Sequence, residues 1–175
     1  GNFREKISIT KVYKGNRDPD HKPVYYKELK DYLINYWKAE VVDGMEADDY
    51  LSIAQDKYGG FGFNENAYEK TYSTIIASID KDMDQISGLH YNFVKKEKYF
   101  VTEEQATKTF YTQLLTGDVV DNIQGVKGIG KKTAEKILAE CKTEKEMYDA
   151  CVKAYNNQEL LNEMAQLVFI RRIEG

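Results

Sequence analysis

The sequence contains few of the residues on which several classes of protein depend. Among its 175 residues are two cysteines, two prolines, two histidines and one tryptophan. Cys141 and Cys151 have no C-x-x-C or other metal-ligand spacing, so they indicate buried thiols in a reducing compartment rather than a disulfide framework or a zinc site. No apolar run reaches the roughly 18 residues of a membrane helix, and no signal-peptide pattern is present. We therefore expect a cytoplasmic protein with no membrane partner.

The composition is typical of one globular domain. Hydrophobic residues make up 42% of the sequence, and a chain of this length can bury a core of its own. The formal net charge of −4 argues against a nucleic-acid-binding protein unless the acidic residues are concentrated in one site. The chain starts at Gly1 without an initiator methionine, so we expect a fragment of a longer protein.

Residues 117–134, with the sequence GDVVDNIQGVKGIGKKTA, combine two carboxylates with a glycine-rich turn and a helix start. Glycine permits positive φ and close backbone approach, and the free N–H groups of the helix expected over 131–141 favour an anion. The lysines favour a nucleic-acid backbone over a small phosphate. A tight structural turn between packed helices is the alternative. The residues expected to contact DNA here are Gly125, Val126, Lys127, Gly128, Gly130, Lys131, Lys132 and Thr133.

Three acidic clusters lie far apart in the sequence. The first, at 46–49, starts a helix expected over 45–54, after a short strand expected over 39–42. The second, at 80–82, follows the apolar run 73–79, which is typical of a central parallel strand covered on both faces. Open α/β sheets bind ligands at such strand ends, although helix-dipole and turn preferences also explain single acids. With the third cluster, the acids are Glu46, Asp48, Asp49, Asp80, Asp82, Asp118 and Asp121.

These seven acids predict a metal site if the strands are neighbours. Carboxylates brought so close repel one another unless cations lie among them. Oxygen ligands without His or Cys fit Mg²⁺ or Mn²⁺ rather than zinc. With the seven set aside, 22 of the 29 acidic residues remain against 25 basic ones, so the objection from net charge no longer holds.

The N-terminal residues combine basic and aromatic side chains. Residues 3–18 interleave five basic residues with Phe3 and Tyr13, a mix typical of segments that grip phosphates and stack on bases, and also of solvated charged loops. Pro23 then opens a helix. We interpret its apolar residues as core-facing rather than as an aromatic binding stripe; they are Tyr26, Leu29, Leu33, Tyr36 and Trp37.

The remaining elements carry no evident chemistry. We expect a hairpin over 89–101 that turns at 95–98. The sequence Thr102-Glu103-Glu104-Gln105 predicts a capping box and a helix that continues through Leu114. Two amphipathic helices are expected over 144–155 and 158–173.

In this order the motifs resemble those of the 5′-nuclease superfamily of flap endonucleases and 5′-to-3′ exonucleases, most closely its bacteriophage members. The resemblance covers roughly residues 3–140. The ordered set is more specific than any one motif. It consists of FR at 3–4, YKGNR at 13–17, GMEADD at 44–49, SIDKD at 78–82 and residues 117–134.

The resemblance implies an α/β fold, with a PIN-like parallel-sheet nuclease core flanked by helices. This core would occupy residues 1–116, with part of a helical arch at about 3–38, and its N-terminal strands would be missing from this chain. Residues 117–175 would form a helix-three-turn-helix DNA-binding subdomain, often with bound K⁺, and C-terminal helices. A monomer is expected.

The resemblance also implies the site chemistry. The seven acids would be direct or water-mediated ligands of two Mg²⁺ or Mn²⁺ ions, Lys14 and Arg17 would meet the scissile phosphate, and Arg4 would contact DNA. Two features depart from the family. Further family carboxylates on strands before the Phe-Arg motif are absent, so weak or no activity is expected of the fragment. Gln124 stands where many cellular members have proline.

The expected function is divalent-metal-dependent hydrolysis of DNA or RNA primers in replication or repair. The partners would be DNA with 5′ ends or flaps, or an RNA–DNA hybrid, in the cytoplasm of a bacterial host if the protein is of phage origin. Asp84 has no matching role. The alternatives are a non-enzymatic DNA-binding module and a PIN-like ribonuclease, which shares the acidic site but not the glycine-rich turn.

Overall fold

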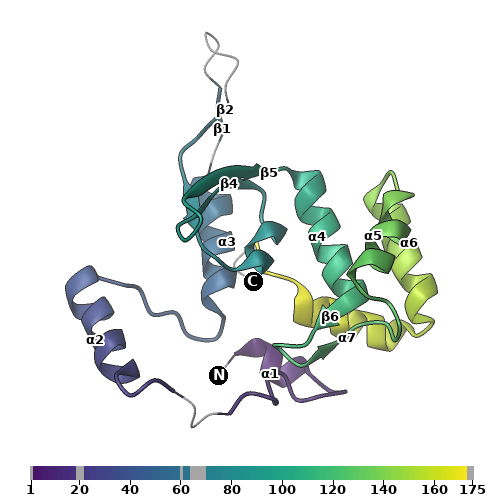
Figure 1. The fold of residues 1–175 in the computed structure, drawn as a ribbon, viewed down its shortest axis with the longest axis horizontal. Coiled ribbons are helices and arrows are strands. Elements are labelled where there is room, and N and C mark those ends of the chain that lie inside the picture. Colours follow the sequence, from purple (N-terminus) through teal and green to yellow (C-terminus); the bar gives the residue numbers. More distant parts are fainter. Residues whose placement is uncertain (1, 19–21, 60, 64–69, 173–175) are drawn as a thin grey trace.

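The computed structural model describes residues 2–18, 22–59, 61–63 and 70–172, in which a small sheet lies beside a group of helices (Figure 1). None of the helices in these ranges is long and apolar enough to cross a membrane. In chain order the elements are α1 (Phe3–Ile7), α2 (Tyr26–Trp37), α3 (Ala47–Tyr58), β1 (Phe61–Phe63), β2 (Lys70–Tyr72), β3 (Ile75–Ala77), the 3-10 helix η1 (Lys81–Gln85), β4 (Gly88–Asn92), β5 (Glu97–Val101), α4 (Glu103–Thr116), β6 (Gly117–Asp118), β7 (Ile123–Gln124), α5 (Lys131–Ala139), α6 (Glu144–Tyr155) and α7 (Gln158–Val168).

Helix α4 is the centre of the helical part, and α5, α6 and α7 all pack against it. It begins at the predicted capping box, which is confirmed: the Thr102 hydroxyl accepts from the Gln105 N–H at 3.1 Å, and Gln105 Oε1 accepts from the Thr102 N–H at 2.9 Å. Burying each large apolar side chain contributes roughly 1.5–3 kcal/mol. The helices on both sides of the loop between α4 and α5 are therefore anchored in this core. The most buried residues of the core include Leu114, Leu115, Leu138, Cys151 and Leu161.

The sheet has the order β3-β4-β5. Strands β3 and β4 are parallel, with Ile76 opposite His90, and β4 and β5 form the predicted hairpin. The fold is therefore mixed α/β, with one parallel strand pair in this sheet. Helix α3 lies next to β3, so the residues that precede α3 and follow β3 reach the same end of the sheet.

Three sequence-based expectations about these elements are wrong. Residues 39–42 form no strand, since no neighbouring strand pairs with them and Val41 is 60% exposed. The run 73–79 is not covered on both faces, because Ile76 is buried whereas Ile75 and Ile79 are exposed. The last helix ends at Val168 rather than at 173, and Phe169 already has an extended backbone.

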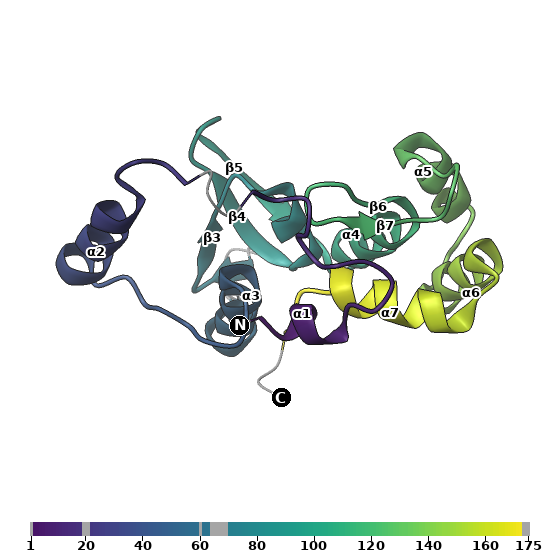
Figure 2. The ribbon, with the colours of Figure 1, turned by 90° about the horizontal axis from the view of Figure 1, so that it is seen from below.

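Helix α2 stands away from the rest of the molecule in both views (Figures 1 and 2). None of its residues is buried, and Tyr36 and Trp37 are 77% and 71% exposed. The core-facing interpretation of its apolar side is therefore wrong. The helical spacing correctly predicted that one side is apolar, but spacing carries no information on what covers that side.

Candidate active site

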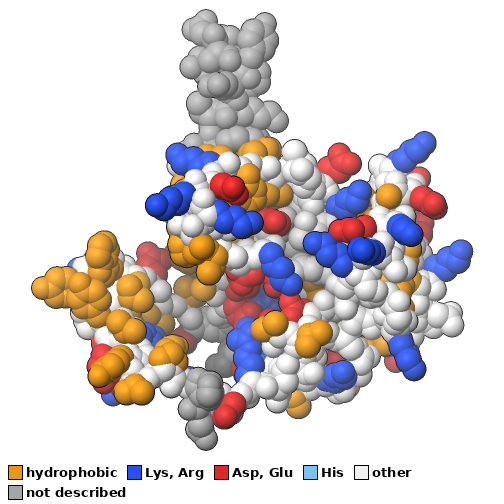
Figure 3. Space-filling view, viewed as in Figure 1, with side chains coloured by type: hydrophobic (Ala, Val, Ile, Leu, Met, Phe, Trp, Pro, Cys, Tyr) orange, Lys and Arg blue, Asp and Glu red, His pale blue; other side chains and the backbone are white. Residues whose placement is uncertain are grey.

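Six of the seven predicted acids line one open pocket, although they come from three separate segments. The pocket has a volume of about 640 Å³, and Lys14, Arg17 and Lys81 also line it. The space-filling view shows Asp and Glu side chains gathered in a hollow near the centre of this face, with Lys and Arg side chains around it (Figure 3). The six acids are Glu46, Asp48, Asp80, Asp82, Asp118 and Asp121.

Local backbone geometry explains why these acids stand where they do. Asp80 is the N-cap of η1, and its Oδ1 accepts from the Asp82 N–H at 3.0 Å. Asp118 Oδ1 accepts from the Val120 N–H at 2.7 Å in the β6-β7 hairpin. Glu46 is the N-cap of α3. Asp80 and Asp118 thus serve a helix start and a turn, which is where short acidic side chains are favoured.

The seventh acid, Asp49, is buried and paired with Arg4. Its Oδ2 lies 2.6 Å from Arg4 Nη1 and its Oδ1 lies 2.8 Å from Arg4 Nη2. The N–H groups of Glu46 and Arg171 donate to the same carboxylate at 3.1 and 2.9 Å. Arg4 also donates to the carbonyl of Leu167 at 3.0 Å. The side chains of Arg4 and Asp49 are both almost inaccessible to solvent. Their contacts hold α1 and α3 against the end of α7, and the proposed site therefore includes neither residue.

Residues 8–18, here called the strap, carry Lys14 and Arg17 to the acids. Backbone N–H groups of Ile9 and Thr10 both donate to Glu163 of α7 at 2.7 Å, which anchors the start of the strap. The Lys14 N–H donates to the carbonyl of Asp121 at 2.9 Å, which fixes its far part on the β6-β7 hairpin.

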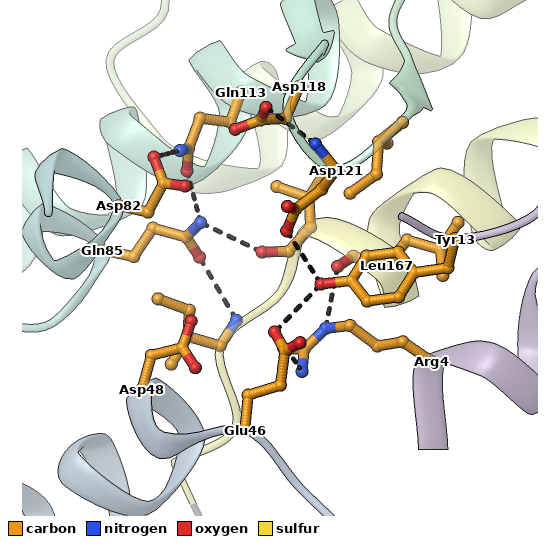
Figure 4. A pocket seen from close by; sticks show the side chains of 13 residues that line it. Arg4, Tyr13, Glu46, Asp48, Asp82, Gln85, Gln113, Asp118, Asp121 and Leu167 are labelled. Carbon is orange, nitrogen blue, oxygen red and sulfur yellow. Dashed lines mark hydrogen bonds and ion pairs between the residues drawn. The ribbon is translucent and has the colours of Figure 1, made fainter. Parts of the chain in front are cut away.

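Tyr13 is buried, and its hydroxyl contacts two acids of the pocket. Its hydroxyl is 2.9 Å from both Glu46 Oε2 and Asp121 Oδ2, so it links two of the acidic clusters (Figure 4). Burial, and then the negative charges of Glu46 and Asp121, raise the pKa of Tyr13, so the hydroxyl stays protonated and donates. In the sequence, Tyr13 was grouped with residues suited to stacking on bases. The YKGNR motif singles out Tyr13, but it does not reveal the contact of Tyr13 with Glu46 and Asp121.

The carboxylate of Asp82 is held by two glutamines that the sequence did not single out. Gln113 of α4 donates to Asp82, and Gln85 donates to Gln113 and, at 3.0 Å, to the carbonyl of Val168 (Figure 4). Burial, and then the charges of Asp80 and Asp118, raise the pKa of Asp82 to about 6. No sequence pattern identifies these glutamines, because Gln113 reaches Asp82 from another element and Gln85 acts on Asp82 only through Gln113.

The raised pKa of Asp82 predicts a pH-dependent effect on stability. Folding penalises the ionised carboxylate, so this penalty is absent below the unfolded pKa of about 4, grows as the pH rises toward about 6, and is complete above it. In metal-free protein, Asp82→Asn should therefore raise the free energy of unfolding at pH 7.5 by about 1–2 kcal/mol, after allowance for partial solvent screening, and change it little near pH 4. Thermal melts in EDTA at both pH values measure this. An equal shift at both pH values would contradict the assignment.

Within the described ranges, no three acidic, histidine or cysteine side chains converge as a ready-made metal site. Basic and amide groups hold several of the carboxylate oxygens instead: Lys14 pairs with Glu46, Arg17 pairs with Asp121, and Gln113 donates to Asp82.

The donor set still fits a divalent cation. Six carboxylates share the pocket with three basic side chains, so negative charge is in excess. Burial, and then the charge of Glu46, also raise the pKa of Asp48. Hard oxygen donors under such repulsion are the ligands that Mg²⁺ and Mn²⁺ take.

The glycine-rich turn exposes part of its predicted DNA surface. Gly128 has φ +85°, and a Cβ there would meet nothing within 4 Å, so a ligand can approach its backbone. Gly125 differs, because a Cβ there would lie 2.2 Å from the Thr116 carbonyl carbon, and Val126 packs against the core. These two residues support the turn from inside. The exposed members are Lys127, Gly128, Gly130, Lys131, Lys132 and Thr133.

Comparisons with known proteins show which sequences and structures this chain is similar to. Residues 104–174 match the family model described as 5′-3′ exonuclease, C-terminal SAM fold. A 5′-3′ exonuclease of Aquifex aeolicus is 31% identical over 77% of this chain and 47% of its own length. A DNA polymerase I of Borreliella burgdorferi is 29% identical over 93% of this chain and 18% of its own length. The chain thus spans less than half of either relative.

A solved structure shares the fold. It is a bacteriophage T5 D15 flap endonuclease in a pseudo-enzyme-product complex with DNA and metal ions. It has a TM-score of 0.56 and 18% identity, and the match covers 95% of this chain and 78% of that one. Together, the family match, the named relatives and the shared fold confirm the resemblance that the motifs predicted.

Proposed function

We propose, from the confirmed resemblance to 5′-3′ exonucleases, that this chain is part of a divalent-metal-dependent 5′ nuclease that hydrolyses phosphodiesters of DNA, or of RNA primers, in replication or repair. One observation carries the proposal: six carboxylates from three distant segments line one pocket beside the basic strap. The T5 relative bound to DNA and metal ions supports it. The substrates would be strands with 5′ ends or flaps, including RNA–DNA hybrids, bound by a monomer.

Two Mg²⁺ or Mn²⁺ ions would be held by the six pocket acids, directly or through water. When bound, such ions polarise the phosphate and lower the pKa of a water molecule. The chain's own residues orient the donors. Tyr13 fixes Glu46 and Asp121, and Gln113 fixes Asp82. We further propose that backbone carbonyl oxygens in the turn at 125–130 bind a K⁺ ion.

Lys14 and Arg17 are proposed to bind the scissile phosphate. Both lie on the pocket wall and are paired with acids, Lys14 with Glu46 and Arg17 with Asp121. Metal ions at those acids would release the two cations toward a phosphate, because a carboxylate pairs more strongly with a divalent ion. The exposed residues of the turn would hold the duplex through its backbone. On this basis, residues 1–116 would form the nuclease core, and residues 117–175 would form the helix-three-turn-helix subdomain and the C-terminal helices.

Helix α2 is proposed to be part of an arch. Both ends of the segment that carries it lie at the acidic pocket, since Arg17 precedes it and Glu46 follows it. Its exposed aromatic side, where the rings of Tyr32 and Tyr36 stack 5.1 Å apart, offers rings to unpaired bases.

The double substitution Tyr36→Ala and Trp37→Ala should weaken binding of a 5′ single-stranded flap about 10-fold or more, since stacking contributes roughly 1–3 kcal/mol per base. Binding of blunt duplex should change less than about twofold. Fluorescence anisotropy without divalent ions measures both affinities. Equal losses for flap and duplex would contradict a stacking role.

The function is tested by titrating Mg²⁺ or Mn²⁺ against a 5′-labelled flap substrate, with this chain and with the full-length protein. Metal-dependent cleavage by the full-length protein is expected, with weak or no cleavage by this chain. A non-enzymatic DNA-binding module is the second candidate, favoured by the basic groups on the acids. It predicts salt-sensitive duplex binding with no metal-dependent cleavage by either protein. Cleavage of RNA alone would instead indicate a PIN-like ribonuclease.

A further inference from the structure

Gln85, the last residue of η1, is buried behind the acidic pocket. Its side chain is 3% exposed and does not line that pocket. It lines instead a small cavity of about 30 Å³, together with Asp82 and Gln113, and Figure 4 shows its side chain next to theirs. A cavity of this size is too small for a nucleotide and has room only for water. Gln85 can therefore affect the acidic pocket only through the residues that it contacts.

The end of α7 and the residues after it fix the side-chain amide of Gln85. The Nε2 group of Gln85 donates to the carbonyl of Val168 at 3.0 Å and to Gln113. Its Oε1 accepts from the N–H of Ile170 at 3.4 Å. The opposite orientation would place the amide oxygen against the Val168 carbonyl, so the amide is held one way round. Arg172 also donates to the backbone carbonyl of Gln85 at 3.0 Å.

The fixed amide of Gln85 in turn sets the orientation of Gln113. Gln85 donates to the side-chain oxygen of Gln113, which leaves the side-chain nitrogen of Gln113 to donate to Asp82. If the Gln113 amide were reversed, its oxygen would face the Asp82 carboxylate and its nitrogen would face another donor. The hydrogen bonds therefore form one directed chain from the end of α7 to an acid of the pocket.

Asp82 is the acid for which such support has the largest effect. It shares the pocket with Asp80 and Asp118, and the negative charges of these two neighbours act on it. Without a donor behind it, the carboxylate would move away from the like charges and would have to be ordered again when a cation binds. Partners that orient a metal ligand typically account for about 10- to 100-fold in metal affinity.

We propose that Gln85 and Gln113 are positioning residues for the divalent-ion site, and that Gln85 acts through Gln113. This inference rests on the proposed function, because Asp82 is one of the six proposed metal ligands. Neither glutamine would touch the ion or the substrate, since neither lines the acidic pocket. Because Gln85 is held by residues 168–172, the affinity of the site for metal depends on the end of α7.

The test is Mn²⁺ binding to the full-length protein without DNA, followed by electron paramagnetic resonance. The variants are Gln113→Met, Gln85→Met and the double variant, since methionine keeps the length of the side chain and removes the amide. Each single substitution should weaken binding about 10-fold. The double variant should bind no more weakly than Gln113→Met, because residues that act through one another have non-additive effects. Gln113→Met alone decides the outcome if Gln85→Met does not fold.

Gln105→Met is the control for a purely structural effect. Gln105 lies on α4 like Gln113, lines neither the acidic pocket nor the small cavity, and accepts the capping hydrogen bond from the Thr102 N–H at 2.9 Å. Its loss should lower the Tm by about 2–4 °C, while Mn²⁺ affinity stays within about twofold. Gln85→Met and Gln113→Met should also raise the Mg²⁺ concentration that gives half-maximal cleavage, with DNA affinity in EDTA within about twofold.

Unchanged Mn²⁺ affinity in Gln113→Met would overturn the inference. An equal loss of affinity in Gln105→Met would also overturn it, because the effect would then reflect the stability of α4. A double variant about 10-fold weaker than Gln113→Met would show that Gln85 does not act through Gln113. Failure of the nuclease proposal is distinct, since the unmodified protein would then show no saturable Mn²⁺ binding or no Mg²⁺-dependent cleavage.

Discussion

Asp80→Asn is expected to slow cleavage of a 5′ flap by the full-length protein by about 1000-fold or more, while DNA affinity stays within a few-fold. Asp80 caps η1 through one side-chain oxygen, and asparagine retains that oxygen, so the turn keeps its shape. The substitution removes one negative charge from the acidic pocket and with it one of the proposed ligands of a divalent ion. Single-turnover cleavage of a labelled flap in Mg²⁺, beside anisotropy in EDTA, separates the two effects.

A matched control for this variant is Asp56→Asn. Asp56 is an exposed acid of α3 that does not line the acidic pocket, so cleavage should stay within about twofold. Cleavage by Asp80→Asn at the rate of the unmodified protein would count against the metal site. A large loss in Asp56→Asn would show that overall charge, rather than the pocket, controls the rate.

Asp49→Ala is expected to lower the free energy of unfolding by about 3–5 kcal/mol, because it leaves the guanidinium of Arg4 buried without its partner. For a chain of this size, that corresponds to a fall in Tm of roughly 10 °C. The interaction with Arg4 lowers the pKa of Asp49 against the opposing effect of burial, so the stabilisation is present above the unfolded pKa of about 4 and is lost as the pH falls through the folded pKa. Thermal melts in EDTA at pH 7.5 measure the change.

The neighbouring acid is the control for this prediction. Asp48 lines the acidic pocket, and its pKa is raised by burial and by Glu46, so Asp48→Ala should leave stability unchanged or slightly higher at pH 7.5. If the Tm of Asp49→Ala were within a degree of that of the unmodified protein and the variant had lost metal affinity, Asp49 would again be a candidate metal ligand. The two substitutions therefore distinguish a structural acid from a ligand.

The sequence predicted the features that depend on neighbouring residues. Local residue spacing and turn residues predicted four of these features: the capping box at Thr102, the hairpin of β4 and β5, and the helices α5 and α6. The meeting of the six acids was predicted only in part from strand ends, because Asp80 follows β3 whereas the strand expected before Glu46 does not form. Ordered motifs were needed to connect the three acidic segments.

Features that depend on tertiary partners were not predictable from spacing. Asp49 and Asp48 are adjacent in the sequence, yet one points at Arg4 and the other at the pocket. The apolar side of α2 looks like a core face in the sequence because helical periodicity does not reveal whether another element covers it. Gln85 and Gln113 form part of the site only because η1 and α4 lie side by side.

Mn²⁺ binding, followed by electron paramagnetic resonance, tests most directly whether these carboxylates form one cation site. The full-length protein and this chain would be titrated beside their Asp82→Asn and Asp56→Asn variants. Saturable binding that Mg²⁺ displaces is expected at least in the full-length protein, with affinity reduced 10-fold or more by Asp82→Asn and unchanged by Asp56→Asn. Absence of saturable binding in both proteins, or equal affinity in both variants, would contradict the acidic site as a metal centre.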